Sequence, residues 1–159
     1  MRGPSYKRST MPKHQPAQRL AEFLPYQLSI ASNAVSTRIA EQYRKRFALK
    51  TTEWRIMAVL GDSGALTPRE IGRATLMDKV AVSRACRTLE GRELAAREPH
   101  SSDGRSHVLG LTATGREVFE EIMEHALEIE ERLFDVLEPD ERETFAGLLD
   151  RVYDRARED

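Results

Sequence analysis

Side chains that can read the edges of nucleic-acid bases gather in a short stretch in the middle of the chain, at Lys79, Val80, Ser83, Arg84 and Arg87. Arginine pairs with guanine edges, serine bonds to a base or a phosphate, and an apolar side chain contacts the methyl group of thymine. The pattern predicts base contacts for the first four residues and a phosphate contact for Arg87. Charged residues on a short helix are also typical of a solvated surface, so the flanking elements must decide between the two interpretations.

A second basic group, Arg105, follows a segment whose proline, serines and Asp-Gly pair are typical of a hairpin tip. An arginine at such a tip can enter the narrow minor groove, where the negative potential is enhanced. Asp103, two residues earlier, can brace the guanidinium through charge-assisted hydrogen bonds. The alternative interpretation is an exposed ion pair with little effect on stability.

Helix-start signals predict the two short helices that would position the first group. Thr67, Pro68 and Glu70 form a capping box with proline at the first helical position, which predicts a helix over 68–74. Asp78 is expected to cap a second helix, to about residue 90, with an inward apolar stripe of Val82, Ala85, Cys86 and Leu89. Strands over 94–98 and 106–111 follow. This order predicts a winged helix-turn-helix, whose second helix enters the major groove of DNA, about 12 Å wide.

Longer helices are predicted on either side of this region. Apolar residues recur at helical spacing over 24–47 and from residue 113 to about 137, and a last helix begins after Glu138 and Pro139. A short helix is expected over 54–60, with a capping sequence at 51–53. The outer apolar stripes predict a homodimer through Phe134, Leu137, Phe145, Leu148 and Val152. The alternative is a helical hairpin within one chain that buries the same residues.

The composition excludes several classes of protein. The 159 residues are 40% hydrophobic and 32% charged, as expected for one soluble domain. The net charge of −1 hides a polarity, because residues 1–116 hold 20 Lys/Arg and 10 Asp/Glu whereas residues 117–159 hold 5 and 16. A long apolar run and a secretory signal are absent, and Cys86 is the single cysteine, which favours a cytoplasmic protein without membrane association. Without a catalytic fingerprint or metal-ligand spacing, no enzyme, cofactor or metal site is expected.

The spacing of Asp103-Gly-Arg105, five residues and then Leu111-Thr-Ala-Thr-Gly115 resembles the wing-to-helix signature of the MarR family of transcriptional regulators. The stretch from Val82 to Glu90 is similar to that family's recognition helix. The resemblance implies a mainly α fold with a small β-wing, in which N- and C-terminal helices form the dimer. It implies DNA-binding roles for Ser83, Arg84, Asp103 and Arg105. Where such proteins carry glycine before the first wing strand this chain has Glu93, so Gly91, two residues earlier, is expected to supply the left-handed turn that ends the helix.

The resemblance further implies a homodimer that binds a pseudo-palindromic operator in double-stranded DNA, usually as a repressor, and releases it when a small ligand binds. Effectors of that family sit between the dimer helices and the winged region, which places the candidates Tyr26, Ser29, Ile30, Asn33, Trp54 and Arg55 there. These residue types fit an aromatic carboxylate or its thioester. Core packing is the alternative for Tyr26 and Trp54, and a helical protein–protein adaptor is the alternative for the whole chain.

Three regions are expected along the chain. Residues 1–20 form a basic N-terminal arm, which carries five Lys/Arg and no acid. Residues 21–50 and 113–159 form a helical dimerisation region. Residues 51–112 form the winged helix-turn-helix that lies between them in sequence. The arm is expected to contact phosphates of flanking DNA or an anionic effector.

Overall fold

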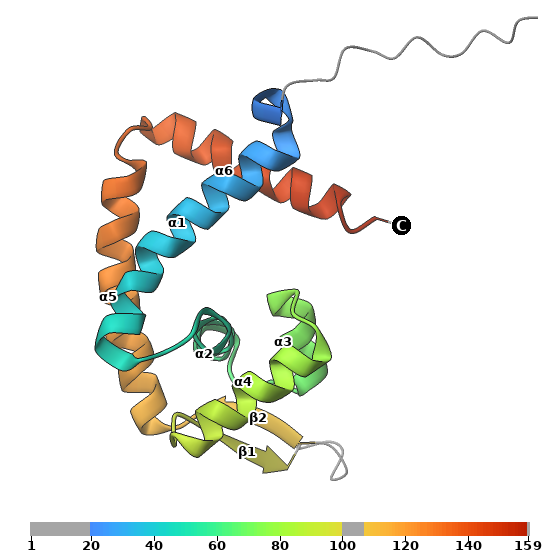
Figure 1. Cartoon of the computed structure of the whole chain (residues 1–159), viewed down its shortest axis with the longest axis vertical. Coiled ribbons are helices and arrows are strands. Elements are labelled where there is room, and N and C mark those ends of the chain that lie inside the picture. Colours follow the sequence, from blue (N-terminus) through green and yellow to red (C-terminus); the bar gives the residue numbers. More distant parts are fainter. Residues whose placement is uncertain (1–19, 100–106, 159) are drawn as a thin grey trace, which may run out of the picture. The chain divides into compact units, whose positions relative to one another are not determined.

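The computed structural model describes residues 20–99 and 107–158, and the chain divides into two compact units, Met1–Ala34 and Val35–Asp159. The elements are a 3₁₀ turn at Leu20–Glu22 and the helices and strands α1 Leu24–Phe47, α2 Thr51–Ser63, α3 Pro68–Thr75, α4 Lys79–Gly91, β1 Ala95–Pro99, β2 His107–Leu111, α5 Ala113–Phe134 and α6 Pro139–Arg155 (Figure 1). The described part of the chain is thus mostly helical with a two-stranded antiparallel sheet, which confirms the predicted fold class. No helix in these ranges is both long and apolar enough to cross a bilayer.

The helix α2 is longer than the predicted 54–60. It begins at Thr51 because the side chain of Glu53 accepts the backbone N–H of Lys50 at 2.8 Å, so Lys50 and not a threonine is the N-cap. It continues through Gly61, whose missing side chain admits the ring of Phe119 from α5; an added Cβ would lie 2.5 Å from that ring. The helix ends at Gly64, whose φ of 81° is the left-handed region that glycine adopts readily.

The predicted caps of α3 and α4 are both present. The hydroxyl of Thr67 accepts the N–H of Glu70, and the carboxylate of Glu70 accepts the N–H of Thr67 at 2.8 Å. The carboxylate of Asp78 accepts the N–H groups of Val80 and Ala81, each at 2.8 Å. These bonds satisfy backbone donors that have no partner within the helix. The turn and the start of α4 are therefore set by local sequence.

Glu93, and not Gly91, takes the left-handed conformation that ends α4. Gly91 is the last helical residue, whereas Glu93 has a φ of 58°. The N–H of Glu93 donates to the carbonyl of Glu90 at 3.0 Å, and the N–H of Leu94 donates to the carbonyl of Leu89 at 2.9 Å. This pair of bonds is the Schellman motif. The expectation for Gly91 was wrong because the motif needs its left-handed residue two positions later.

The guanidinium of Arg92, at the same helix end, ties α4 to the end of α1. It donates to the carbonyls of Phe47, at 2.5 Å, and of Ala48, at 3.3 Å. Ala48 itself has a φ of 50°, so the chain turns sharply there before α2 begins. The C-terminal ends of α1 and α4 are thereby joined by one side chain.

The two strands pair antiparallel from Ala95 opposite Leu111 to Pro99 opposite His107. The first strand starts one residue later than predicted, because the N–H of Leu94 is used by the Schellman motif. The predicted start of the second strand, Ser106, lies outside the described residues. Leu66 exchanges backbone hydrogen bonds with Leu109, of 3.0 and 2.8 Å, so the segment before α3 is attached to the hairpin.

The Leu-Thr-x-x-Gly signature closes the hairpin onto α5. The hydroxyl of Thr112 donates to the carbonyl of Glu93 at 2.6 Å and accepts the N–H of Gly115 at 3.0 Å. A Cβ on Gly115 would lie 1.8 Å from the carbonyl oxygen of Leu94. Threonine and glycine in this signature are thus required by the junction itself.

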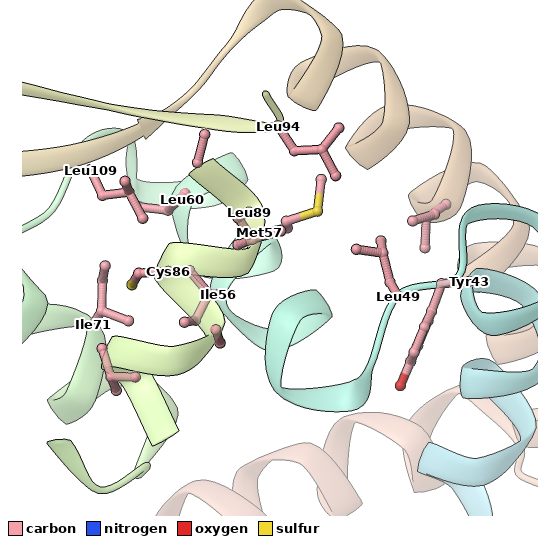
Figure 2. Close-up of a cluster of buried hydrophobic side chains, with 14 of the residues drawn as sticks. Tyr43, Leu49, Ile56, Met57, Leu60, Ile71, Cys86, Leu89, Leu94 and Leu109 are labelled. Atoms are coloured by element: carbon pink, nitrogen blue, oxygen red, sulfur yellow. The ribbon is translucent and has the colours of Figure 1, made fainter. Parts of the chain in front are cut away.

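The core fills the space between α2, α3, α4, the hairpin and α5. Figure 2 shows Ile56, Met57 and Leu60 of α2 together with Leu89 of α4 and Leu109 of β2, and all five are at most 2% exposed. The predicted inward stripe of α4 is confirmed, because all of its members lie in this cluster. Burying side chains of this size stabilises a fold by about 1.5–3 kcal/mol each. The helix α4 therefore packs against the core along one face, and its opposite face is left exposed.

The end of α5 differs from the prediction. The helix ends at Phe134 and not near Leu137, because the N–H of Leu137 and the guanidinium of Arg142 both donate to the carbonyl of Phe134, at 3.1 and 2.8 Å. The carboxylate of Glu141 then accepts the N–H of Glu138 at 2.9 Å, and Pro139 occupies the first position of α6, as predicted from sequence.

Candidate nucleic-acid interface

The outer face of α4 carries every side chain that the sequence assigned to DNA there. Lys79, Val80, Ser83, Arg84 and Arg87 are all exposed, whereas Val82, Ala85, Cys86 and Leu89 on the opposite face are buried. In Figure 1, α4 runs beside α3 and above the β1–β2 hairpin. A helix held along one face and bare along the other can enter a groove without any change in the fold.

The cations on this face differ in their existing contacts. The Nε of Arg87 donates to the carbonyl of Ser83 at 3.3 Å, so this side chain lies along the helix. Lys79 and Arg84 take part in no side-chain ion pair within the described ranges. Arg97 on β1, by contrast, is paired with Glu90 at 2.7 Å. The two unpaired cations lie in the N-terminal half of α4, where groove contacts are expected.

Two further cations, Arg69 and Arg73, are exposed on α3 and were not among the predicted site residues. They lie four residues apart, so they share one face of the helix. That spacing, together with the capping box before it, is the sequence signal that could have found them. They extend the positive surface from α4 onto the preceding helix.

The wing residues Asp103 and Arg105 lie outside the described residues, so their roles remain predictions. The strands that would carry the wing are in place, and the sheet register aligns them from Pro99 and His107 inward.

The predicted dimer residues lie on apolar surface that the single chain leaves open. Leu148 and Val152 on α6 are 48% and 55% exposed, and no residue of α6 is buried. The rings of Phe134 and Phe145 contact each other, with centroids 6.2 Å apart, and Leu137 is half-buried. An intrachain hairpin that buries the whole set, the alternative interpretation, is therefore disfavoured.

The candidate effector residues fall into two groups. Tyr26, Ser29, Ile30 and Asn33 are exposed on the first turns of α1, within the first unit. Trp54 is half-buried and stacks between the rings of Tyr43 and Phe119, with centroids 5.6 and 6.0 Å away, which supports the packing interpretation for much of its surface.

Trp54 also lines an open cleft of about 380 Å³ between the second half of α1, α2 and α5, whereas Arg55 is exposed and does not line it. The other lining residues are mainly apolar: Val35, Ile39, Ala58, Met123, Ala126, Leu127, Glu130, Leu133 and Phe134. Sequence reasoning missed the residues of α5, which form most of one wall. One of them, Phe134, had been assigned to the dimer contact instead.

The remaining reactive groups are structural in this fold. Burial raises the pKa of the Cys86 thiol, and the nearby carboxylate of Glu90 raises it further. The protonated thiol is a poor nucleophile, which agrees with an inert core cysteine. Within residues 20–99 and 107–158, no cluster of His, Cys, Asp and Glu is arranged to bind a metal ion.

Comparison with known proteins finds relatives that are named as transcriptional regulators. A model of the MarR family matches residues 49–106. The uncharacterized HTH-type transcriptional regulator YxaD of Bacillus subtilis (strain 168) is 26% identical over 113 residues, which are 70% of this chain and 79% of that protein. The family model covers most of the predicted winged region, and the relative matches a longer part of the chain.

Two solved structures extend the likeness to the flanking helices. A MarR/EmrR family transcriptional regulator from Acinetobacter sp. ADP1 is 27% identical, with a TM-score of 0.79 over 87% of this chain and 98% of its own. BpsR of Bordetella bronchiseptica, whose DNA binding is regulated by 6-hydroxynicotinic acid, is 25% identical, with a TM-score of 0.76 over 88% and 99% of the two chains. The named relatives are regulators and not enzymes. Residues 49–106 thus match the MarR family, and most of the chain is similar to solved winged helix-turn-helix regulators of that family.

Proposed function

We propose that two copies of this chain form a homodimer that binds a pseudo-palindromic operator and represses transcription until a small aromatic ligand releases it. The observation that carries the proposal is the exposed face of α4, where Lys79 and Arg84 have no ion-pair partner among residues 20–99 and 107–158, while the opposite face is fixed in the core. A dimer would present two such helices to successive turns of a duplex. The neighbouring cations of α3 add attraction to phosphate that does not depend on sequence.

The proposed dimer contact includes Leu148 and Val152 of α6. Single exposed apolar residues are common, but a whole helix without a buried residue gains little stability from packing within its own chain. The acidic character of the chain after residue 116 supports the same arrangement, because it keeps negative charge away from the DNA-facing side.

The proposed effector site is the cleft beside Trp54. Its apolar lining and its volume of about 380 Å³ suit a single aromatic ring with a polar group. That BpsR responds to 6-hydroxynicotinic acid supports an aromatic acid as the class of effector. We expect the ligand to favour a form of the dimer in which the two α4 helices are wrongly spaced for DNA, which lowers affinity by selection between forms.

DNA binding of the purified protein tests the proposal. The duplex is first selected from a random 30-base-pair pool, and its dissociation constant is measured as a function of salt. A regulator should bind the selected duplex far more tightly than a scrambled one, with affinity that falls steeply as salt rises. Equal binding to both sequences, or none, would contradict the proposal and favour the adaptor alternative.

Two arginine variants then separate base contacts from phosphate contacts. Arg84→Ala should cost about 1–3 kcal/mol and relax the base preference at one position in each half-site. Arg87→Ala should weaken binding to all sequences alike and lower the salt slope by about one. Arg132→Ala removes the same charge from an exposed position of α5 and is the matched control, with binding expected to stay unchanged.

A further inference from the structure

Two large apolar side chains are exposed in the winged region, and both lie at the turn that leads into α4. Leu76 is 68% exposed and Val80 is 59% exposed. All other large hydrophobic residues that the structure describes between positions 51 and 112 are buried or half-buried. Leu76 is the C-cap of α3, and Val80 is the second residue of α4.

Leu76 is also held in an unfavourable backbone conformation. Its φ and ψ are 54° and 28°, in the left-handed region that glycine and asparagine adopt at little cost and leucine does not. The exposed side chain recovers little of that cost by burial. Folding alone would therefore favour a residue without this side chain, and an unfavourable conformation that persists on a binding surface indicates a role in binding.

The charges around the pair favour one kind of partner. Arg69 and Arg73 on α3 and Lys79 and Arg84 on α4 are exposed on the same two helices. The two acids between positions 69 and 84, Glu70 and Asp78, accept backbone N–H groups as caps. An apolar protein surface would have to desolvate these cations without a counter-charge. Duplex DNA offers phosphates for the cations, and in its major groove it displays an apolar group, the methyl of thymine.

We propose that Leu76 determines sequence specificity together with Val80, the two side chains reading thymine methyl groups in the major groove. This inference rests on the proposed function and extends it to a residue outside α4. It predicts that each half-site of the operator contains a thymine whose methyl group, and not its hydrogen-bonding edge, contributes to affinity.

Replacing thymines in the selected duplex by deoxyuridine tests this, because the exchange removes the methyl group and leaves base pairing intact. The wild-type protein should bind about fourfold more weakly at each contacted position, the value expected for one buried carbon. Leu76→Asn keeps a residue suited to the left-handed conformation and removes the apolar side chain. With this variant, deoxyuridine at the Leu76 position should have no further effect, while the position read by Val80 stays sensitive.

Two matched variants complete the experiment. Leu76→Met should keep the methyl sensitivity, and Val80→Ala should remove it at the other position only. Circular dichroism and thermal unfolding should show Leu76→Asn folded and no less stable than the wild type. Unchanged deoxyuridine sensitivity in Leu76→Asn, or its absence from the wild type, would overturn the inference while leaving operator binding intact. If Leu76→Asn loses regulation while its DNA binding is unchanged, the inference is overturned as well, and a protein partner is indicated. Failure of the wild type to select any duplex would instead refute the proposed function itself.

Discussion

The winged region and the last helix bury their apolar side chains to very different extents. In the winged region, Ile56, Met57, Leu60 and Ile71 have no measurable exposure. In α6, Phe145, Leu148, Leu149, Val152 and Tyr153 are between 38% and 55% exposed, although they lie on one stripe of the helix. Both segments have amphipathic sequences. The difference is that one completes its core within the chain and the other does not.

This contrast separates two uses of the same periodic pattern. An apolar stripe in sequence indicates that a face will be covered, but it does not indicate by which chain. In the winged region the covering elements come within a few tens of residues, so a single copy suffices. For α6 we infer a second copy, and the predictions that follow test this division in order of decreasing effect.

Charging the stripe of α6 should have the largest effect. Leu148→Glu combined with Val152→Glu is expected to raise the dimer dissociation constant by about a thousandfold, or about 4 kcal/mol, because four apolar side chains per dimer are replaced by carboxylates. Sedimentation velocity measures the change. Gly147→Glu adds an acid to the same helix at a position where a Cβ meets no other atom within 4 Å, and it should leave the dimer intact. A double variant that remains a dimer would place the interface elsewhere.

Filling the junction at Gly115 should destabilise the winged region itself. Gly115→Ala brings a methyl group against the backbone of Leu94, which cannot move aside without disturbing the Schellman motif. We expect a loss of about 2–3 kcal/mol in the free energy of unfolding, measured by urea denaturation. In the control Gly147→Ala, on the open helix, stability should be unchanged or higher by up to about 1 kcal/mol. Equal effects of the two alanines would remove the distinction between closed and open regions.

Removing the cap of α3 should have a smaller effect. Thr67→Ala deletes the hydroxyl that accepts the N–H of Glu70, at a cost of about 1 kcal/mol in the free energy of unfolding. Thr67→Ser retains an accepting oxygen and serves as the control. If the two variants unfold at the same denaturant concentration, the capping bond does not contribute to stability.

Relieving the backbone at Glu93 should have the smallest effect, with the opposite sign. Glu93→Gly is expected to raise the free energy of unfolding by about 0.5–1 kcal/mol, because glycine adopts the φ of 58° without a steric penalty. Gly91→Ala, within the helix, should also stabilise modestly, since Gly91 has no left-handed role there. A destabilised Glu93→Gly variant would mean that the glutamate side chain contributes more than its conformation costs.

The parts of this structure that could be predicted from sequence are those set by neighbouring residues. Thr67 and Asp78 are recognisable as caps because their partners lie two or three residues away. The buried stripe and the exposed basic face of α4 follow from helical spacing alone. The exposure of the candidate DNA contacts on α4 follows from the same local rules.

The parts that could not be predicted depend on contacts between distant residues. The extension of α2 through Gly61 depends on Phe119, and the guanidinium of Arg116 adds a hydrogen bond of 2.9 Å to the Gly61 carbonyl. The left-handed Glu93 is favoured by the junction with Thr112, nineteen residues later in the chain. The cleft beside Trp54 is formed with α5, which sequence reasoning had assigned to dimerisation alone.

The bridge that Arg92 makes from α4 to the end of α1 has a mechanical consequence. The proposed ligand cleft is lined by Val35 and Ile39, about two to three and a half turns before the Phe47 and Ala48 carbonyls that accept from Arg92. A ligand that widens the cleft and displaces this part of α1 would therefore also displace the C-terminal end of α4. The ligand would then act on α4 through its C-terminal end. Arg92→Ala should therefore leave DNA binding and ligand binding intact, but the ligand should no longer lower the affinity for DNA.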